Sequence, residues 1–279
     1  MITYEPENSP FKNIYCDIVH RCNMECANCY LPFRHYPDLP KEKVIDFIKR
    51  FTKSTEFRFI GGEPTLHKHL PEIVKVASDL GHRPTIATNG LRTANKKYLQ
   101  KLKDAGLKTV YLSMTGFDDD NVYMITDKLK CAKKKMKTLE NVVELNLRLS
   151  IGCIIIKGLN EHIIDKIIMS MHKYNYRPGT SFEFRNVGQV GRSMVDKPDN
   201  YSFDDLKKLI TDKLTPGAIF ENSGYSYSFK HNKYRINCTN WEGVDGGFDD
   251  KTNSVRGRLT QDYKVAPFLE HIKENEGGY

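Results

Sequence analysis

Three of the seven cysteines in this 279-residue chain fall within eight residues: Cys22, Cys26 and Cys29, in the stretch HRCNMECANCYLPF. Three thiolates cannot all pair as disulfides, and they are one ligand short of the closed set of a four-ligand structural site. Their spacing lets one loop place three sulfurs around a compact inorganic centre. A four-iron cluster held at three corners would keep one iron open to a small molecule.

A structural zinc site is the simplest alternative for these cysteines. His20 precedes Cys22 by two residues and could close the coordination of a zinc ion as its fourth ligand. The remaining cysteines are too scattered for a second centre, so we expect one centre only. They are interpreted as core or inert thiols: Cys16, Cys131, Cys153 and Cys238.

The elements that must position this loop alternate between strand and helix patterns. Apolar runs predict strands at 14–20, 57–60, 84–88, 110–114, 147–156 and 181–187. Apolar residues at helical spacing predict helices at 41–53, 70–77, 99–105, 129–143 and 160–174. Six strand–helix units predict a parallel sheet with helices outside, curled by right-handed crossovers towards a barrel. The predicted fold class is therefore α/β, an incomplete (β/α)6 TIM-like barrel, because a closed barrel has eight units.

Unusual residues follow four of the predicted strands at their carboxyl ends. The cysteines follow the first strand, Gly61-Gly62-Glu63 the second and Thr88-Asn89-Gly90 the third, while Ser113 ends the fourth. Active sites of such folds lie at the carboxyl ends of the strands. We therefore expect all four groups at one rim.

The pattern changes after about residue 190. We predict a core at 1–190 and an extension at 191–279, an α+β cap that covers the open side of the barrel. A helix is expected at 203–214, a hairpin at 226–237 that turns near His231-Asn232, and a last helix at 266–275.

Four motifs in this order resemble the radical S-adenosylmethionine (radical SAM) superfamily. They are the C-x3-C-x2-C loop, Gly61-Gly62-Glu63-Pro64, Ala87-Thr88-Asn89-Gly90 and the stretch 112–116. The resemblance covers about residues 14–190. It implies a [4Fe-4S] cluster on the three cysteines and S-adenosylmethionine chelated to the open iron. Reductive cleavage then yields methionine and a 5′-deoxyadenosyl radical, which abstracts hydrogen from a substrate. An electron donor such as flavodoxin or ferredoxin is implied as well.

The resemblance also implies roles for single residues. Glu63 and the Gly62 carbonyl are expected to meet the methionine ammonium, and Ser113 the ribose. Gly61 lets backbone approach the cofactor, and Pro64 stiffens the turn. Further contacts are expected from Asn28 (where the family usually has an aromatic residue), Asn89, Gly152 in the wall 151–155, and the Val187 backbone.

A cation is expected to face the methionine carboxylate. The candidates left open are Arg148, Arg185 and the lysines between 128 and 137, although a solvated helix face explains those lysines best. Arg192 and Trp241 are candidate substrate contacts. Core packing of the extension is the preferred interpretation of Trp241 with Tyr225, Tyr227 and Phe229.

Composition fits an ordinary globular protein, with 39% hydrophobic and 28% charged residues. No apolar run is long enough to span a membrane, the N-terminus lacks a signal-peptide pattern, and we expect a cytoplasmic protein. The net charge of +8 is attributed to surface lysines rather than nucleic-acid binding.

A small molecule or nucleotide is the expected substrate. The alternatives are a peptide or partner protein, and a non-catalytic Fe–S or zinc-binding interaction protein.

Overall fold

The computed structural model describes residues 2–31, 35–188, 200–241 and 256–267. Its centre is a run of six parallel neighbouring strands: β1 (Asn13–Val19), β2 (Glu56–Gly61), β3 (Arg83–Thr88), β4 (Thr109–Ser113), β5 (Arg148–Ile154) and β6 (Ser181–Arg185). The connecting helices are α1 (Lys41–Lys49), α2 (Leu70–Asp79), α3 (Lys96–Asp104), α4 (Asp120–Thr126), α5 (Ala132–Glu144) and α6 (His162–Lys173). Two short 3-10 helices, η1 (Pro6–Asn8) and η2 (Pro64–Leu66), complete this part. The predicted partial barrel is confirmed.

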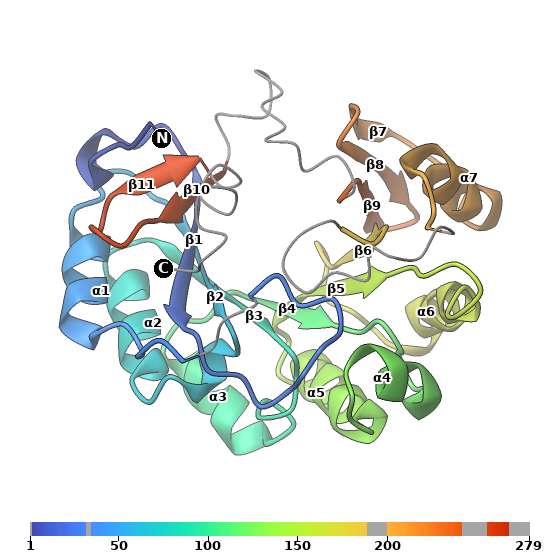
Figure 1. Ribbon diagram of the computed structural model, residues 1–279, viewed down its shortest axis with the longest axis horizontal. Coiled ribbons are helices and arrows are strands. Elements are labelled where there is room, and N and C mark those ends of the chain that lie inside the picture. Colours follow the sequence, from blue (N-terminus) through green and yellow to red (C-terminus); the bar gives the residue numbers. More distant parts are fainter. Residues whose placement is uncertain (1, 32–34, 189–199, 242–255, 268–279) are drawn as a thin grey trace.

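The segment after residue 190 adds strands to both ends of this sheet. Its elements are α7 (Phe203–Lys213), β7 (Ile219–Asn222), β8 (Ser226–His231), β9 (Tyr234–Thr239), β10 (Arg256–Leu259) and β11 (Val265–Pro267). The sheet order is β11-β10-β1-β2-β3-β4-β5-β6-β9-β8-β7, with β9 parallel to β6 and β10 parallel to β1. The sheet curves so that its end strands face each other without pairing (Figure 1).

The structure confirms some of the elements predicted after residue 120 and differs for others. The helix predicted at 129–143 corresponds to α5, which begins at Ala132, and Leu129 lies before it, next to Lys128 with its positive φ of 56°. The short helix α4 was not predicted. The hairpin is confirmed by β8 and β9. The last predicted helix lies mostly outside the described residues, and its first two positions belong to β11. The domain boundary at residue 190 and the covering role of the extension remain predictions.

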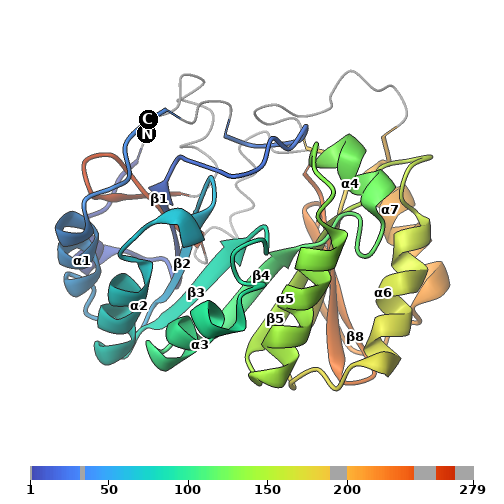
Figure 2. The same ribbon diagram turned by 90° about the horizontal axis from the view of Figure 1, so that it is seen from below.

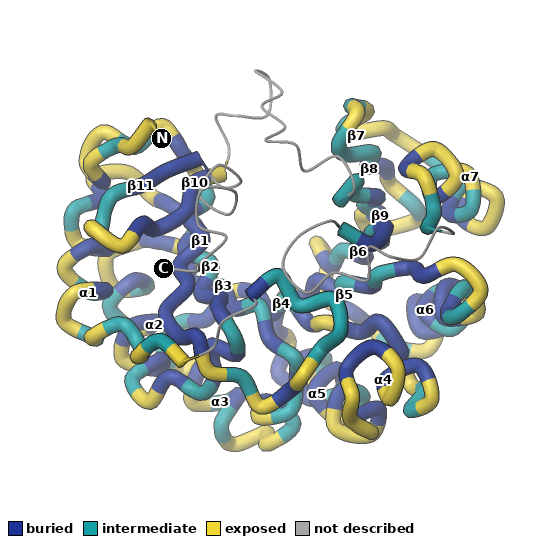
Figure 3. Tube along the Cα trace, in the orientation of Figure 1, coloured by how far each residue is buried: buried dark blue, intermediate teal, exposed yellow. Residues whose placement is uncertain are grey.

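The two faces of the sheet have different chemistry. Phe57 and Phe59 of β2, and Phe182 and Phe184 of β6, are fully buried in the apolar core against the helices. The helices show exposed residues on their outward side and buried residues towards the sheet (Figure 3). Side chains alternate along a strand, so the neighbouring positions lie on the inner face. Among the described residues, no helix is long and apolar enough to cross a membrane.

A buried ion pair joins the first strand to the added strand β10. The Arg258 Nε donates to Asp17 Oδ2 at 2.7 Å, with side-chain exposures of only 2% and 1%. Tyr30, directly after the third cysteine of the loop, donates its hydroxyl to Asp17 Oδ1 at 3.0 Å. A residue more than 200 positions away is thus connected through Asp17 to the cysteine loop.

Replacing Arg258 should destabilise the fold strongly. Arg258→Ala leaves the buried Asp17 carboxylate without this cation, and we expect the free energy of unfolding to fall by about 3–5 kcal/mol. Urea denaturation followed by circular dichroism measures the change. Arg256→Ala, on the same strand at an exposed position, should cost no more than about 0.5 kcal/mol; equal losses for both variants would contradict the assignment.

Candidate active site

The cysteine loop leaves β1 and runs across the carboxyl ends of the central strands towards α4 (Figures 1 and 2). Cys22, Cys26 and Cys29 are half-buried free thiols. Among the described residues, no three His, Cys, Asp or Glu side chains are gathered closely enough to hold one metal ion. In a four-iron cluster each thiolate binds its own iron, so the three sulfurs lie at separate corners of the cluster rather than around one ion.

The middle of the loop is fixed to the end of α4. The Ala27 N–H donates to the Thr126 carbonyl at 2.8 Å. The neighbouring Cys26 thiol makes a hydrogen-bond contact with Asp127, and burial, assisted by the Asp127 charge, raises its pKa. The sequence analysis did not predict α4, and it therefore missed Asp127 as a residue of the site. Cys131, interpreted above as an inert thiol of a lysine-rich helix, is buried in one cluster with Met24 and Tyr123, which contacts Cys22 and Cys26.

The Gly61-Gly62 turn packs directly against the start of the loop. A Cβ on Gly61 would lie 2.0 Å from the Val19 carbonyl oxygen, and one on Gly62 would lie 2.3 Å from the Arg21 carbonyl oxygen. Gly61 also has a φ of +124°, which favours glycine. The Gly62 N–H donates to Val19 at 2.7 Å and the Glu63 N–H to Arg21 at 2.9 Å. The glycines thus allow this turn to pair with the backbone that leads to Cys22.

Glu63 is buried and joins two of the motifs. Its Oε1 accepts hydrogen bonds from the Thr65 hydroxyl at 2.6 Å and the Thr88 hydroxyl at 2.7 Å, and its Oε2 from the Asn89 N–H at 2.7 Å. Burial raises the Glu63 pKa, although these hydrogen bonds act in the opposite direction. A cation placed beside Oε2 would stabilise the ionised carboxylate. Pro64 is buried as the first residue of η2.

Asn89 reaches from the end of β3 to the cysteine loop. Its Nδ2 donates to Asn23 Oδ1 at 2.8 Å and lies 3.8 Å from Cys22 Sγ, in a sulfur hydrogen bond. Its own Oδ1 accepts from the Leu91 N–H. The TNG motif therefore contacts the first cysteine directly.

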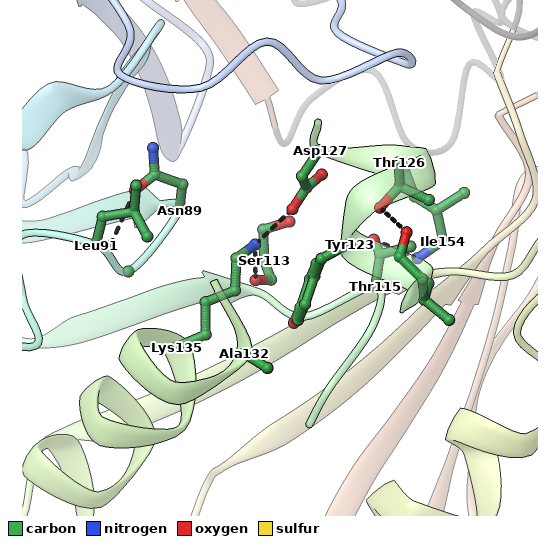
Figure 4. Close-up of polar contacts among 12 residues, drawn as sticks. Asn89, Leu91, Ser113, Thr115, Tyr123, Thr126, Asp127, Ala132, Lys135 and Ile154 are labelled. Carbon is green, nitrogen blue, oxygen red and sulfur yellow. Dashed lines mark hydrogen bonds and ion pairs between the residues drawn. The ribbon is translucent and has the colours of Figure 1, made fainter. Parts of the chain in front are cut away.

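Lys135 holds the end of β4 and the end of α4 together. Its ammonium donates to Asp127 Oδ2 at 2.9 Å and to the Ser113 carbonyl at 3.0 Å, as Figure 4 shows. The side chain is 1% exposed and lies 4.5 Å from the Tyr123 ring centroid. The interpretation of the lysine run as a solvated face is thus wrong for Lys135, whereas Lys133 and Lys134 are exposed. The Ser113 side chain is exposed at the end of its strand.

Strands β5 and β6 bring three of the predicted residues together. Gly152 pairs with Ser113, and a Cβ there would lie 4.0 Å from an Arg185 nitrogen. Arg185 forms an ion pair with Glu183, and its guanidinium lies 5.2 Å from the Trp241 ring centroid. Trp241 is therefore a rim residue stacked on Arg185, and the preferred interpretation as a core residue of the extension needs correction.

The remaining candidate residues that the structure describes either lie away from the rim, have backbone groups that are already hydrogen-bonded, or make no contact that bears on the site. Arg148 opens β5 and is exposed beside Gly179, at the amino end of the strand, whereas the site lies at the carboxyl ends. Both backbone groups of Val187 bond to Asn200, so they are occupied in this structure. Asn28 is half-buried in a turn of the loop, and Arg192 lies outside the described residues.

Residues 17–171 match the family model of the radical SAM superfamily, which is more than half of the chain. The chain belongs to the radical SAM superfamily. Enzymes of this family use a [4Fe-4S] cluster and S-adenosylmethionine, and the donor set found here, three free thiols beside a buried carboxylate, fits both groups.

Two curated relatives with different named activities are similar to this chain in sequence. A 7,8-dihydro-6-hydroxymethylpterin dimethyltransferase of Methanocaldococcus jannaschii is 28% identical and covers 75% of this chain and 43% of its own length. A GTP 3′,8-cyclase of Aquifex aeolicus is 28% identical over 65% of this chain and 58% of its own length. This chain thus spans about half the length of these two relatives.

The solved structure of SuiB from Streptococcus suis has the same fold. It matches with a TM-score of 0.68 at 16% identity, over 95% of this chain and 62% of SuiB. SuiB bound to S-adenosylmethionine matches with a TM-score of 0.66. At this identity the similarity concerns the fold alone.

A side chain on Gly62 should displace the turn from the cysteine loop. Gly62→Ala is expected to destabilise the chain by about 1–3 kcal/mol, because the added methyl group overlaps the Arg21 backbone. It should also bind less iron after anoxic reconstitution. Gly224→Ala is the matched control, since a Cβ there meets nothing within 4 Å. Full iron content in Gly62→Ala would contradict the proposed packing role.

The Lys135–Asp127 pair can be tested by a double-mutant cycle. Lys135→Met should cost about 3–5 kcal/mol, because Asp127 stays buried without its cation. Adding Asp127→Asn should recover part of the loss, since the uncompensated charge is removed. Lys134→Met, at the exposed neighbouring position, is the control. Additive losses in the double variant, measured by urea denaturation, would show that the two groups act independently.

Proposed function

We propose that this chain binds a [4Fe-4S] cluster through Cys22, Cys26 and Cys29, cleaves S-adenosylmethionine reductively and abstracts hydrogen from a small molecule or nucleotide. The observation that carries the proposal is the connected set of contacts at the rim. Asn89 contacts Cys22 and bonds to Glu63, and the turn before Glu63 pairs with the backbone that leads to Cys22. The cysteines and the expected cofactor-binding residues are thus one structural unit.

The surrounding residues would bind and orient the cofactor. Glu63 Oε2 and the Gly62 carbonyl would accept hydrogen bonds from the methionine ammonium, and Ser113 would bond the ribose. When bound, the cluster supplies one electron to the sulfonium, which releases methionine and the 5′-deoxyadenosyl radical. Among the described residues, Arg185 and Lys135 are candidate cations for the methionine carboxylate at this rim, and Lys135 would have to share its ammonium with Asp127.

The substrate proposal is supported by the relatives. The two curated relatives are named for a pterin and a nucleotide substrate. SuiB has been solved with a precursor peptide, but its likeness to this chain is one of fold. We therefore prefer a small molecule or nucleotide over a peptide as the proposed substrate. All seven cysteines are free thiols, which agrees with a reducing cytoplasmic location, and a flavodoxin or ferredoxin is the proposed electron donor.

The activity is tested without knowledge of the substrate. Anoxically reconstituted protein, reduced with dithionite and given S-adenosylmethionine, should form 5′-deoxyadenosine and methionine. Cys26→Ala should form neither, because one corner of the cluster loses its ligand, while Cys238→Ala, at a buried position remote from the loop, should keep its iron. Liquid chromatography with mass spectrometry measures both products. A protein with iron and sulfide that forms no 5′-deoxyadenosine would favour a binding protein.

A further inference from the structure

The inner face of the sheet, below the candidate active site, carries an unusual set of charged residues. Barrel interiors of this type are normally filled by layers of apolar side chains. Here the inward positions include Glu56 and Arg58 on β2, Tyr111 on β4, and Glu183 and Arg185 on β6. Charged groups are costly to bury unless they are paired. Their presence on this face therefore calls for a functional explanation.

These inner-face residues are held in fixed positions by one another. Arg58 lies 3.5 Å from the Tyr111 ring centroid and donates to Glu56 at 3.1 Å. It also donates to the Tyr15 hydroxyl at 2.6 Å. Tyr111 donates to the same Glu56 oxygen at 3.3 Å. Such a network presents a rigid polar surface to a ligand, with little entropy to lose on binding.

The side chains between these groups are small. Thr85 and Ala87 on β3, and Ser150 and Gly152 on β5, occupy the inward positions between the large residues of β2, β4 and β6. Arg58 and Glu183 remain partly exposed, with side-chain exposures of 14% and 16%. A flat molecule can therefore reach the carboxylates and guanidinium groups from the inner side.

Glu183 is the best placed of these groups for binding a substrate beside the cofactor. It pairs with Gly152, which pairs with Ser113, so Glu183 lies two strand spacings, about 10 Å, from the predicted ribose contact. Burial acts to raise its pKa, but the charges of Arg185, Arg58 and Arg256 outweigh this and lower the pKa to about 2. The carboxylate is thus an acceptor at every physiological pH.

Glu183 retains acceptor capacity towards the inner side. One oxygen accepts from the Ser150 hydroxyl at 3.3 Å and the other from Arg185. A carboxylate has about four acceptor positions, so two remain. Beside it, Arg185 offers donors that bond carbonyl oxygens of planar rings, and Trp241 offers an aromatic face. The combination suits a ring whose edge carries adjacent N–H donors next to a carbonyl.

We propose that Glu183 and Arg185 bind the 2-amino-4-oxopyrimidine ring of the substrate, the ring that guanine and pterin share. Glu183 accepts from the ring N–H and the amino group, and Arg185 donates to the carbonyl oxygen. The inference rests on the proposed function and names its substrate class. The two curated relatives act, by their names, on GTP and on a pterin, and both substrates contain this ring.

Equilibrium dialysis of the reconstituted protein with GTP, ITP and ATP tests the proposal. The three nucleotides share the triphosphate, but ITP lacks the amino group and ATP has neither the amino group nor the carbonyl. In the presence of S-adenosylmethionine, GTP should bind at least about tenfold more tightly than ITP or ATP, since hydrogen bonds to a charged group are lost. Competition by 6-hydroxymethylpterin shows whether a pterin or a guanine ring is preferred.

Glu183→Gln should remove most of the preference for GTP over ITP, because the amide offers one acceptor oxygen in place of two. ITP binding should weaken less than GTP binding, since ITP loses only the charge assistance to its ring N–H. Glu42→Gln, at a residue 75% exposed on α1, is the matched control and should bind GTP as the unaltered protein does. Equal binding of the three nucleotides, binding of neither GTP nor pterin, or an intact GTP preference in Glu183→Gln would overturn the proposal. The nucleotide comparison in the unaltered protein needs no variant to fold. Formation of 5′-deoxyadenosine without added substrate tests the proposed function separately.

Discussion

Two backbone hydrogen bonds, from Gly62 to Val19 and from Glu63 to Arg21, fix the cysteine loop to the end of β2. The loop has no regular secondary structure around its three cysteines, so its geometry must come from such outside contacts. Only a turn without side chains at two successive positions can approach the end of β1 so closely. Asn89, directly after β3, adds contacts to Asn23 and Cys22, and Thr126 of α4 adds one to Ala27. Three segments that are distant in sequence thereby hold the loop that carries the three sulfurs.

Ion pairs lie at three places on the inner face of the sheet or at its rim, and two of them are buried. Asp17 with Arg258 ties the loop to β10, and Asp127 with Lys135 sets a charge-compensated pair beside Cys26. Glu183 with Arg185 lies on the β6 side. A buried pair seldom stabilises a fold more than apolar packing would. We relate all three to the proposed function of this face, which would accommodate a charged cofactor and the proposed polar substrate, whereas the apolar residues face the helices.

The sequence contained enough information for the central sheet and for the motifs at its rim. Apolar periodicity predicted all six strands of the core, and Gly-Gly-Glu and Thr-Asn-Gly stood directly after two of them. The sequence pattern could not show that Lys135 is buried, because Lys133 and Lys134 beside it are also lysines. The difference is the ion pair with Asp127, which depends on how the chain folds. The sequence pattern also failed to predict β10 and β11, because strands of three or four residues are too short to show a reliable alternation. Arg148 stood at the start of its predicted strand, and because sites of this fold lie at the carboxyl ends of the strands, that position already argued against it as a site residue.

The central claim is that three cysteines hold a four-iron cluster whose fourth iron is open to S-adenosylmethionine. Mössbauer spectroscopy of protein reconstituted with iron-57 tests it most directly, because each iron site contributes its own signal. We predict a [4Fe-4S] spectrum in which one iron of the four changes its isomer shift when S-adenosylmethionine is added, and no such change in Glu63→Ala protein. Four irons that are unaffected by S-adenosylmethionine, or zinc in place of iron after anoxic preparation, would contradict the account.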